Sequence, residues 1–192
     1  TFPGLKKAKK LTVTQGYNAN LAIISFEDLE EVTGAMSLQE GSYVNNVVQP
    51  VQFPKLVKVG SFTYGGVLKT LSLPALQEVT GVCSIGTCFT NGVPAMLESI
   101  NLPALKRVGT LKLTIGGATG SNPNTMITNL DCFENLESAE SVYIEKQMGL
   151  ISYKGLAKVI AGLNDAEAWE VIGNAFNPTF EEVKAGKLEK EE

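Results

Sequence analysis

The most informative pattern in the 192-residue chain is a short motif of apolar and polar positions that recurs six times. The motif has seven positions. An apolar residue comes first, the second position is often Pro, and the third can be any residue. Leu follows at the fourth position, then two polar residues, then Val or Ala. The leading apolar residues are Phe2, Phe26, Phe53, Leu73, Leu102 and Phe133. They stand 20 to 31 residues apart, whereas the motif keeps its length. Such recurrence predicts a repeat protein in which one loop per repeat changes size.

Each motif separates two segments in which apolar and polar residues alternate. In the fourth repeat Leu68 and Leu71 precede the motif, and Cys83 and Ile85 follow it. A period of two is typical of β-strands. Proline cannot donate to a sheet ladder, so the first strand should end where the motif carries Pro3, Pro54, Pro74 and Pro103. Glycine marks the start of the second strand, where we expect a positive φ or a β-bulge, at Gly34, Gly60, Gly81 and Gly109.

One such coil cannot bury its own apolar edge, but stacked coils bury it in continuous columns. The clearest column is formed by the motif leucines Leu29, Leu56, Leu76, Leu105 and Leu136. Each fully buried side chain of this size contributes about 1.5–3 kcal/mol before entropy is counted. The sequence therefore predicts a mainly β fold, a right-handed β-solenoid of about six coils over residues 1–149.

Residues 150–192 depart from the repeat and predict a C-terminal α/β cap of the same domain, with a helix, a strand and a short helix. Solenoids need such caps because their last strand has an unpaired edge. After the expected N-cap Ser152, apolar residues recur at helical spacing at Leu156, Val159, Ile160 and Leu163. A last strand is expected within residues 169–176. Thr179 and Glu182 have the spacing of a capping box, with Gly186 as the helix stop.

The repeat resembles a known family. The run from Leu97 to Leu113, LESINLPALKRVGTLKL, is similar to the receptor L-domain repeat, a leucine-rich-repeat-like β-helix of growth-factor receptor ectodomains and fungal cell-wall proteins. Residues 169–174 and 177–179 also resemble the C-terminal end of leucine-rich-repeat surface proteins of gut Bacteroides-type bacteria. The resemblance implies export to the cell surface as a lipoprotein, anchored through a segment upstream of Thr1. The disulfide framework of the receptor ectodomains is missing, so no growth-factor-receptor role is implied.

Composition narrows the classes of partner. Charged residues make up 19% of the chain, the formal net charge is −4, and no basic stripe is present, so we expect no nucleic-acid partner. The cluster of lysines at positions 6, 7, 9 and 10 is interpreted as a solvated turn. No apolar run reaches the roughly 18 residues of a transmembrane helix. The absence of an Asn-x-Ser/Thr sequon favours a bacterial source.

Candidate chemistry is sparse. The chain has no His, which removes Ser-His-Asp and Cys-His nucleophile systems and most zinc sites. Three cysteines do not make a disulfide framework, and either a Cys83–Cys88 bridge or free buried thiols would fit. Most acids fall in the solvent turns, and Asp131 alone falls on a predicted ladder, so the acid pair of a glycosidase is not favoured. We therefore expect no catalytic residue, no metal and no cofactor.

Two surfaces could bind a ligand. If the apolar residues of the second strand point inward, an outward row is formed by Thr12, Ser37, Thr63, Ser84, Lys112 and Tyr143. The variable loops carry the aromatic residues Tyr17, Tyr43 and Phe89 among small polar residues, a combination suited to glycan or protein contact. The candidate ligand-binding residues are thus Tyr17, Tyr43, Phe89, Lys112 and Tyr143. The alternatives are that the rings pack under their own loops and that the polar sheet face has no ligand.

These observations favour a non-catalytic extracellular or cell-surface module for binding or adhesion, which recognises a protein or a glycan. A second hypothesis is an envelope scaffold without a specific ligand. A third and less favoured one is a carboxylate-dependent, glycan-active enzyme. The sequence indicates no particular ligand and no oligomeric state.

Overall fold

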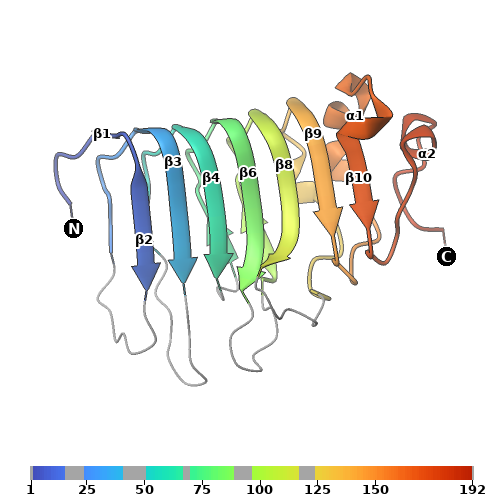
Figure 1. Ribbon diagram of the computed structural model, residues 1–192, viewed down its shortest axis with the longest axis horizontal. Helices are drawn as coiled ribbons and strands as arrows, with labels where there is room; N and C mark the ends of the chain where they lie inside the picture. Colours follow the sequence, from blue (N-terminus) through green and yellow to red (C-terminus); the bar gives the residue numbers. More distant parts are fainter. Residues whose placement is uncertain are drawn as a thin grey trace.

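The computed structural model describes residues 2–15, 24–40, 51–66, 70–88, 97–116 and 124–191. They form a mainly β structure, a β-solenoid of about five turns with a small helical part at its C-terminal end (Figure 1). Each of the six motifs contributes one rung, and we number the rungs 1 to 6 from the one that begins at Phe2. The predicted β-solenoid is confirmed, and its number of turns differs slightly from the six coils expected.

One wall of the solenoid is an eight-stranded sheet in which all pairings are parallel. Figure 1 shows its strands side by side along the long axis. In stack order they are β1 (Lys7–Ala8) with β2 (Leu11–Gln15), β3 (Glu31–Glu40), β4 (Lys58–Gly66), β6 (Glu78–Cys88), β8 (Arg107–Gly116), β9 (Ser138–Glu145) and β10 (Trp169–Ile172). Strands β1 and β2 both pair with β3, so they are two halves of the first rung.

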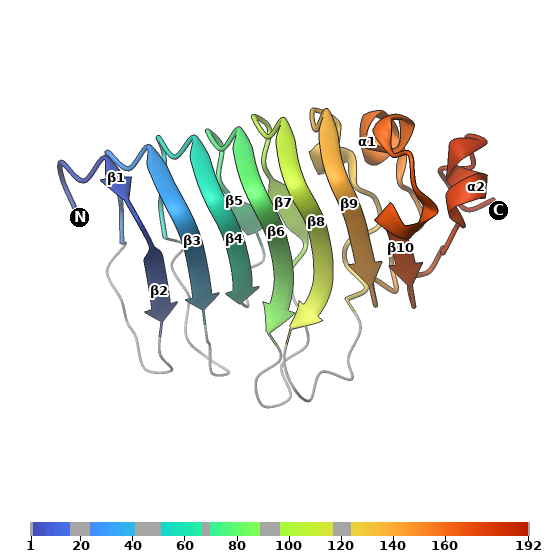
Figure 2. The same ribbon diagram turned by 45° about the horizontal axis from the view of Figure 1, so that its top comes forward.

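The second wall is less regular than the sequence pattern predicts. It contains a two-stranded parallel sheet of β5 (Thr70–Ser72) and β7 (Ser99–Asn101), which lies behind the long sheet in Figure 2. Elsewhere in the described residues this wall is held by isolated bridges, such as Ser25 with Gln52. Asp131, expected on this ladder, instead starts the 3₁₀ helix η1 (Asp131–Phe133).

The apolar columns between the walls form as predicted. The motif leucines of rungs 2 to 6 have at most 1% of their surface exposed. The Phe26 ring lies between those of Phe2 and Phe53, with centroid distances of 4.6 and 5.1 Å and nearly parallel planes. Stacking repeats the same contact from rung to rung, so one side chain per coil builds a core along the whole axis.

The glycines that begin the long strands lie at β-bulges, which is one of the two predicted roles. The register shifts between Val59 and Phe62 of β4, and at the matching places of β3 and β6. The other predicted role, a positive φ, is wrong for these glycines, since the described glycines with positive φ are Gly4, Gly173 and Gly186. Glycine is required at the bulge for space. A Cβ on Gly60 would lie 2.5 Å from the carbonyl oxygen of Thr33 in the preceding rung.

The C-terminal part covers the last rung with short helices. They are η2 (Lys154–Leu156), α1 (Ala157–Gly162), η3 (Ala166–Ala168) and α2 (Phe180–Lys184), and β10 continues the sheet between η3 and α2. The capping box of Thr179 and Glu182 is present, and Gly186 ends that segment with φ of +92°. Ser152 does not cap α1, because a 3₁₀ turn precedes the helix and places Leu156 at the N-cap.

Buried polar contacts fasten this part to the stack. The indole Nε1 of Trp169 donates to the carbonyl oxygen of Pro178 at 3.0 Å. The buried amide of Asn174 donates to the carbonyl oxygen of Ile144 in β9 at 3.0 Å and to the hydroxyl of Tyr153 at 3.2 Å. Polar groups withdrawn from water need such partners. The bond from Asn174 to Ile144 joins the cap to the last rung, and the other two hold the cap together.

Candidate functional site

The outer face of the long sheet carries an unbroken row of side chains, one from each of the six rungs and one from β10. Strand register places Thr12, Ser37, Thr63, Ser84, Lys112, Tyr143 and Glu170 directly beside one another. Parallel strands lie about 4.8 Å apart, so the row offers polar groups at that regular interval. The predicted outward phase is confirmed, and the row extends further than predicted because β10 adds Glu170 to it.

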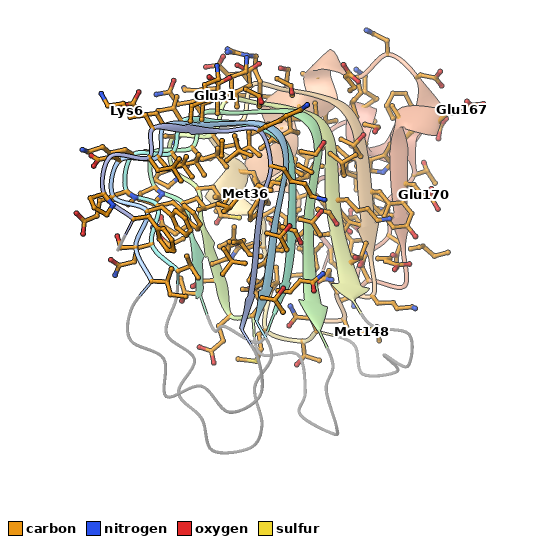
Figure 3. All side chains as sticks on the ribbon, turned by 60° about the vertical axis from the view of Figure 1, so that its left-hand side comes forward. Lys6, Glu31, Met36, Met148, Glu167 and Glu170 are labelled. Atoms are coloured by element: carbon orange, nitrogen blue, oxygen red, sulfur yellow. The ribbon has the colours of Figure 1, made fainter. Side chains whose placement is uncertain are left out.

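The row changes character along its length. From rung 1 to rung 4 it consists of small hydroxyl side chains, and from rung 5 onward it is charged and aromatic. Beside it, Val82 and Ile172 leave 41% and 56% of their surface exposed. Figure 3 shows the side chain of Met36 inside the stack and that of Glu170 on the outside.

Lys112, Tyr143 and Glu145 form the most structured group on this face. The ammonium nitrogen of Lys112 lies 4.9 Å from the ring centroid of Tyr143, within the range of a cation–π contact. The Tyr143 hydroxyl donates to Oε2 of Glu145 at 2.8 Å. Two neighbours thus contact the half-buried ring, one at its face and one at its hydroxyl. The sequence pattern indicated Lys112 and Tyr143 but missed Glu145, whose contact with Tyr143 depends on side-chain direction along β9.

The carboxylates around Tyr143 also set its acidity. The hydrogen bond to Glu145, followed by desolvation and the charges of Glu145 and Glu170, raises the pKa of Tyr143 to about 12. The phenol is neutral at physiological pH, its one O–H is donated to Glu145, and its oxygen can accept a hydrogen bond from a ligand. A rigid aromatic ring with a neutral hydroxyl, flanked by one cation and two carboxylates, suits recognition of a polar ligand.

A groove of about 300 Å³ lies on the second wall, where the sheet is interrupted. Strand β7 forms one side with Ser99 and Ile100, and Met126, which is 50% exposed, lies on the other. The chain opposite β7 bridges to the segment that follows β9 instead of pairing with β7, through Asn124 with Gln147 and Asn129 with Ser152. The groove is therefore a gap between two stacked segments, with mixed polar and apolar walls.

The thiols that can be described are not reactive centres. Cys83 is free and fully buried in the core, and burial raises its pKa to about 12. The predicted alternative of a Cys83–Cys88 bridge is therefore wrong, since both residues belong to the extended strand β6. Cys132 is free and half-buried beside the groove, and burial raises its pKa to about 12 as well. Thiols held neutral in this way are poor nucleophiles and poor metal ligands.

The other predicted ligand-binding residues are the aromatic residues of the variable loops. Tyr17, Tyr43 and Phe89 lie outside the described residues, so their part in a site stays a prediction. Within the described ranges, no group of three or more Cys, Asp or Glu side chains is placed to hold a metal ion. In the same ranges no helix is long and apolar enough to cross a membrane.

The fold and the outer face define a β-solenoid with a row of polar side chains that includes an aromatic group near one end. In comparisons with known proteins, no family profile, no curated protein and no solved structure matches the chain.

Proposed function

We propose that this chain is a non-catalytic binding or adhesion module of the cell surface, and that it recognises a protein or a glycan with the outer face of its long sheet. The observation that carries the proposal is the row from Thr12 to Glu170, in which seven neighbouring strands each present one side chain in register. A row at a regular interval of about 4.8 Å fits an extended ligand that lies across several strands.

The group around Tyr143 is the proposed anchor for this ligand. Binding surfaces derive most of their affinity from a few rigid aromatic and charged residues, and the rest of the contact area contributes mainly complementarity. Tyr143 is already oriented by Lys112 and Glu145, so little side-chain entropy is lost when a ligand contacts it. The hydroxyl side chains of rungs 1 to 4 would then hydrogen-bond along the ligand.

The family and the location belong to the same proposal. The motif of residues 97–113 supports a leucine-rich-repeat, receptor-L-domain-like protein, and residues 169–179 support a bacterial surface lipoprotein. Lipid anchoring through a segment upstream of Thr1 is tested by the gene sequence at that point and by metabolic labelling with a fatty acid. A gene that encodes neither an export signal nor a lipidated Cys there would contradict the proposed anchoring.

The binding surface is tested by screening the protein against glycan arrays and extracellular-matrix proteins. Lys112→Ala and Tyr143→Ala are compared with Lys190→Ala, which removes an exposed lysine near the C-terminus. We expect the two face variants to weaken binding at least tenfold, while the control binds as the unmodified protein does. Unchanged binding by the face variants, with loss after combined substitution of Tyr17, Tyr43 and Phe89, would move the site to the loops. No ligand in either screen would favour the scaffold hypothesis.

A further inference from the structure

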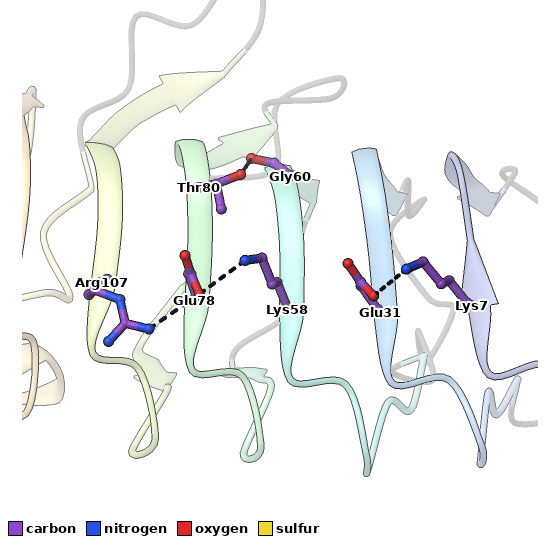
Figure 4. A network of polar contacts seen from close by, with 7 residues as sticks. All are labelled: Lys7, Glu31, Lys58, Gly60, Glu78, Thr80 and Arg107. Atoms are coloured by element: carbon purple, nitrogen blue, oxygen red, sulfur yellow. Dashed lines mark hydrogen bonds and ion pairs between the residues drawn. The ribbon is translucent and has the colours of Figure 1, made fainter.

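Charged side chains at the start of the long strands neutralise one another across neighbouring rungs (Figure 4). The ammonium nitrogen of Lys7 lies 2.8 Å from a carboxylate oxygen of Glu31. Lys58 and Arg107 approach the carboxylate of Glu78 from its two sides, each at 3.3 Å. These charges have partners within the chain, so none of them depends on a ligand for neutralisation.

Glu170 has no such partner. Strand β10 places it on the outer face directly beside Tyr143, and Figure 3 shows its side chain on the outside of the stack. No hydrogen bond or ion pair joins its carboxylate to another described residue. Glu145 is engaged through Oε2 only, which accepts the Tyr143 hydroxyl. Two carboxylates and one ammonium group, that of Lys112, thus surround the ring and leave a negative charge there.

The Tyr143 ring has one face left for a ligand. In register, Tyr143 stands between Lys112 on one side and Glu170 on the other. The Lys112 ammonium lies over one face of the ring, 4.9 Å from its centroid. The opposite face is therefore turned towards β10 and Glu170. Aromatic faces carry partial negative charge, so a ring face beside a carboxylate favours a cation.

An apolar side chain lies next to this ring face. Ile172 follows Glu170 by two positions on the same strand and therefore points to the same side of the sheet. Register places it beside Glu145, and 56% of its surface is exposed. Long cationic side chains lay their methylene groups on apolar surface while the charged end stays among polar groups. Tyr143, Glu145, Glu170 and Ile172 offer both kinds of contact, and we call them the cation site.

The chemistry of the cation site selects its occupant. A neutral glycan carries no charge to offset the two carboxylates, and an acidic glycan would be repelled by them. Among protein side chains, arginine matches the site best. Its planar guanidinium group stacks on aromatic rings, and its fork of N–H groups donates to carboxylates. The ammonium group of lysine offers neither the plane nor the fork.

We propose that the cation site binds an arginine side chain of a partner protein. The guanidinium group stacks on the face of Tyr143 that is turned away from Lys112, and its N–H groups donate to Glu145 and Glu170. The methylene groups of the arginine lie on Ile172. The site belongs to the outer face, so this proposal rests on the binding function proposed above and names the chemistry of the partner.

Three synthetic peptides test the proposal. They are short and identical, with arginine, citrulline or lysine at the centre between glycine and serine residues. Citrulline has the shape of arginine without its charge and is the matched control. Each is titrated to millimolar concentration into the ¹⁵N-labelled protein, and amide chemical shifts are recorded. The arginine peptide should shift the amides of the cation site, and added salt should weaken this effect. The lysine peptide should bind more weakly, and the citrulline peptide should cause no shift.

Variants of the protein separate the cation site from general attraction to an acidic surface. Glu145→Gln and Glu170→Gln should each weaken binding of the arginine peptide about two- to fivefold, the range for one exposed ion pair. Glu167→Gln is the matched control, because it removes the same charge from an exposed residue of η3, outside the row. It should bind as the unmodified protein does. Tyr143→Phe keeps the ring and should still bind, whereas Tyr143→Leu should bind about two- to fivefold more weakly.

Four results would overturn the proposal. Equal shifts with the arginine and citrulline peptides would show that charge is not recognised, and equal affinity for the lysine peptide would contradict the assignment to arginine. Equal weakening by Glu167→Gln and Glu170→Gln would reduce the effect to general charge attraction. In the last case the glycan and matrix-protein screens find a ligand that Tyr143→Ala weakens, but the arginine peptide shifts no amide of the cation site. The binding function would then hold, and only the arginine partner would be wrong.

Discussion

Replacing Gly60 by alanine tests the closeness of the rungs, on which the whole fold depends. The new Cβ would lie 2.5 Å from the Thr33 carbonyl oxygen, and 2.7 and 2.9 Å from the carbonyl oxygen and Cα of Gly34. All three atoms are backbone, so the strain cannot be relieved by turning a side chain. Gly60 has no positive φ, so the substitution causes no dihedral strain, and loss of unfolded-state entropy alone would stabilise the protein by about 0.4–1 kcal/mol.

Steric overlap in a packed interior costs about 1–3 kcal/mol and outweighs that gain. We therefore expect Gly60→Ala to lower the free energy of unfolding by about 1–2 kcal/mol and the melting temperature by about 2–8 °C. Thermal and urea unfolding, followed by circular dichroism, measure both quantities. Gly162→Ala is the matched control, because a Cβ at this site at the end of α1 meets no atom within 4 Å. That variant should be neutral or slightly more stable. If Gly60→Ala proves as stable as Gly162→Ala, adjacent rungs do not approach this closely.

Three further predictions concern the core, the ion pairs and the outer face. Leu76→Ala, in the middle of the leucine column with 0% exposure, should lower the free energy of unfolding by about 2–5 kcal/mol in urea titrations. The hydrogen bond from Lys58 lowers the pKa of Glu78 below its usual 4.5, so its stabilisation is complete above that value and is lost as pH falls through the folded-state pKa. Glu78→Gln should therefore make acid unfolding less steep, and an unchanged acid profile would contradict the pairing. The pKa of Tyr143, about 12, should fall towards 10 in Glu145→Gln when tyrosinate absorbance is titrated, and a constant value would exclude the hydrogen bond as its cause.

Features that repeat within one coil could be predicted from the amino-acid pattern. The motif predicted which residues point inward. Apolar and polar residues alternate in the strands on either side of a motif of fixed length, so one side of each strand is apolar. It also predicted the capping box of Thr179 and Glu182, which depends on two residues three positions apart. The outward positions of Lys112 and Tyr143 followed from the same alternation, since each lies between two buried neighbours.

Contacts between coils could not be predicted from the pattern and depend on how the coils stack. Register across the cap placed Glu170 beside Tyr143, and the approach of rung 2 explained why Gly60 must be glycine. The second sheet ends at β7 because the next stretch of chain bridges to the segment after β9 and not to β7, which also depends on how the coils stack. These contacts join residues about one repeat apart in the chain, and the repeats differ in length. The alternation of residues along one strand predicts which side of that strand is apolar. Which atoms of neighbouring coils come into contact depends on how the coils stack.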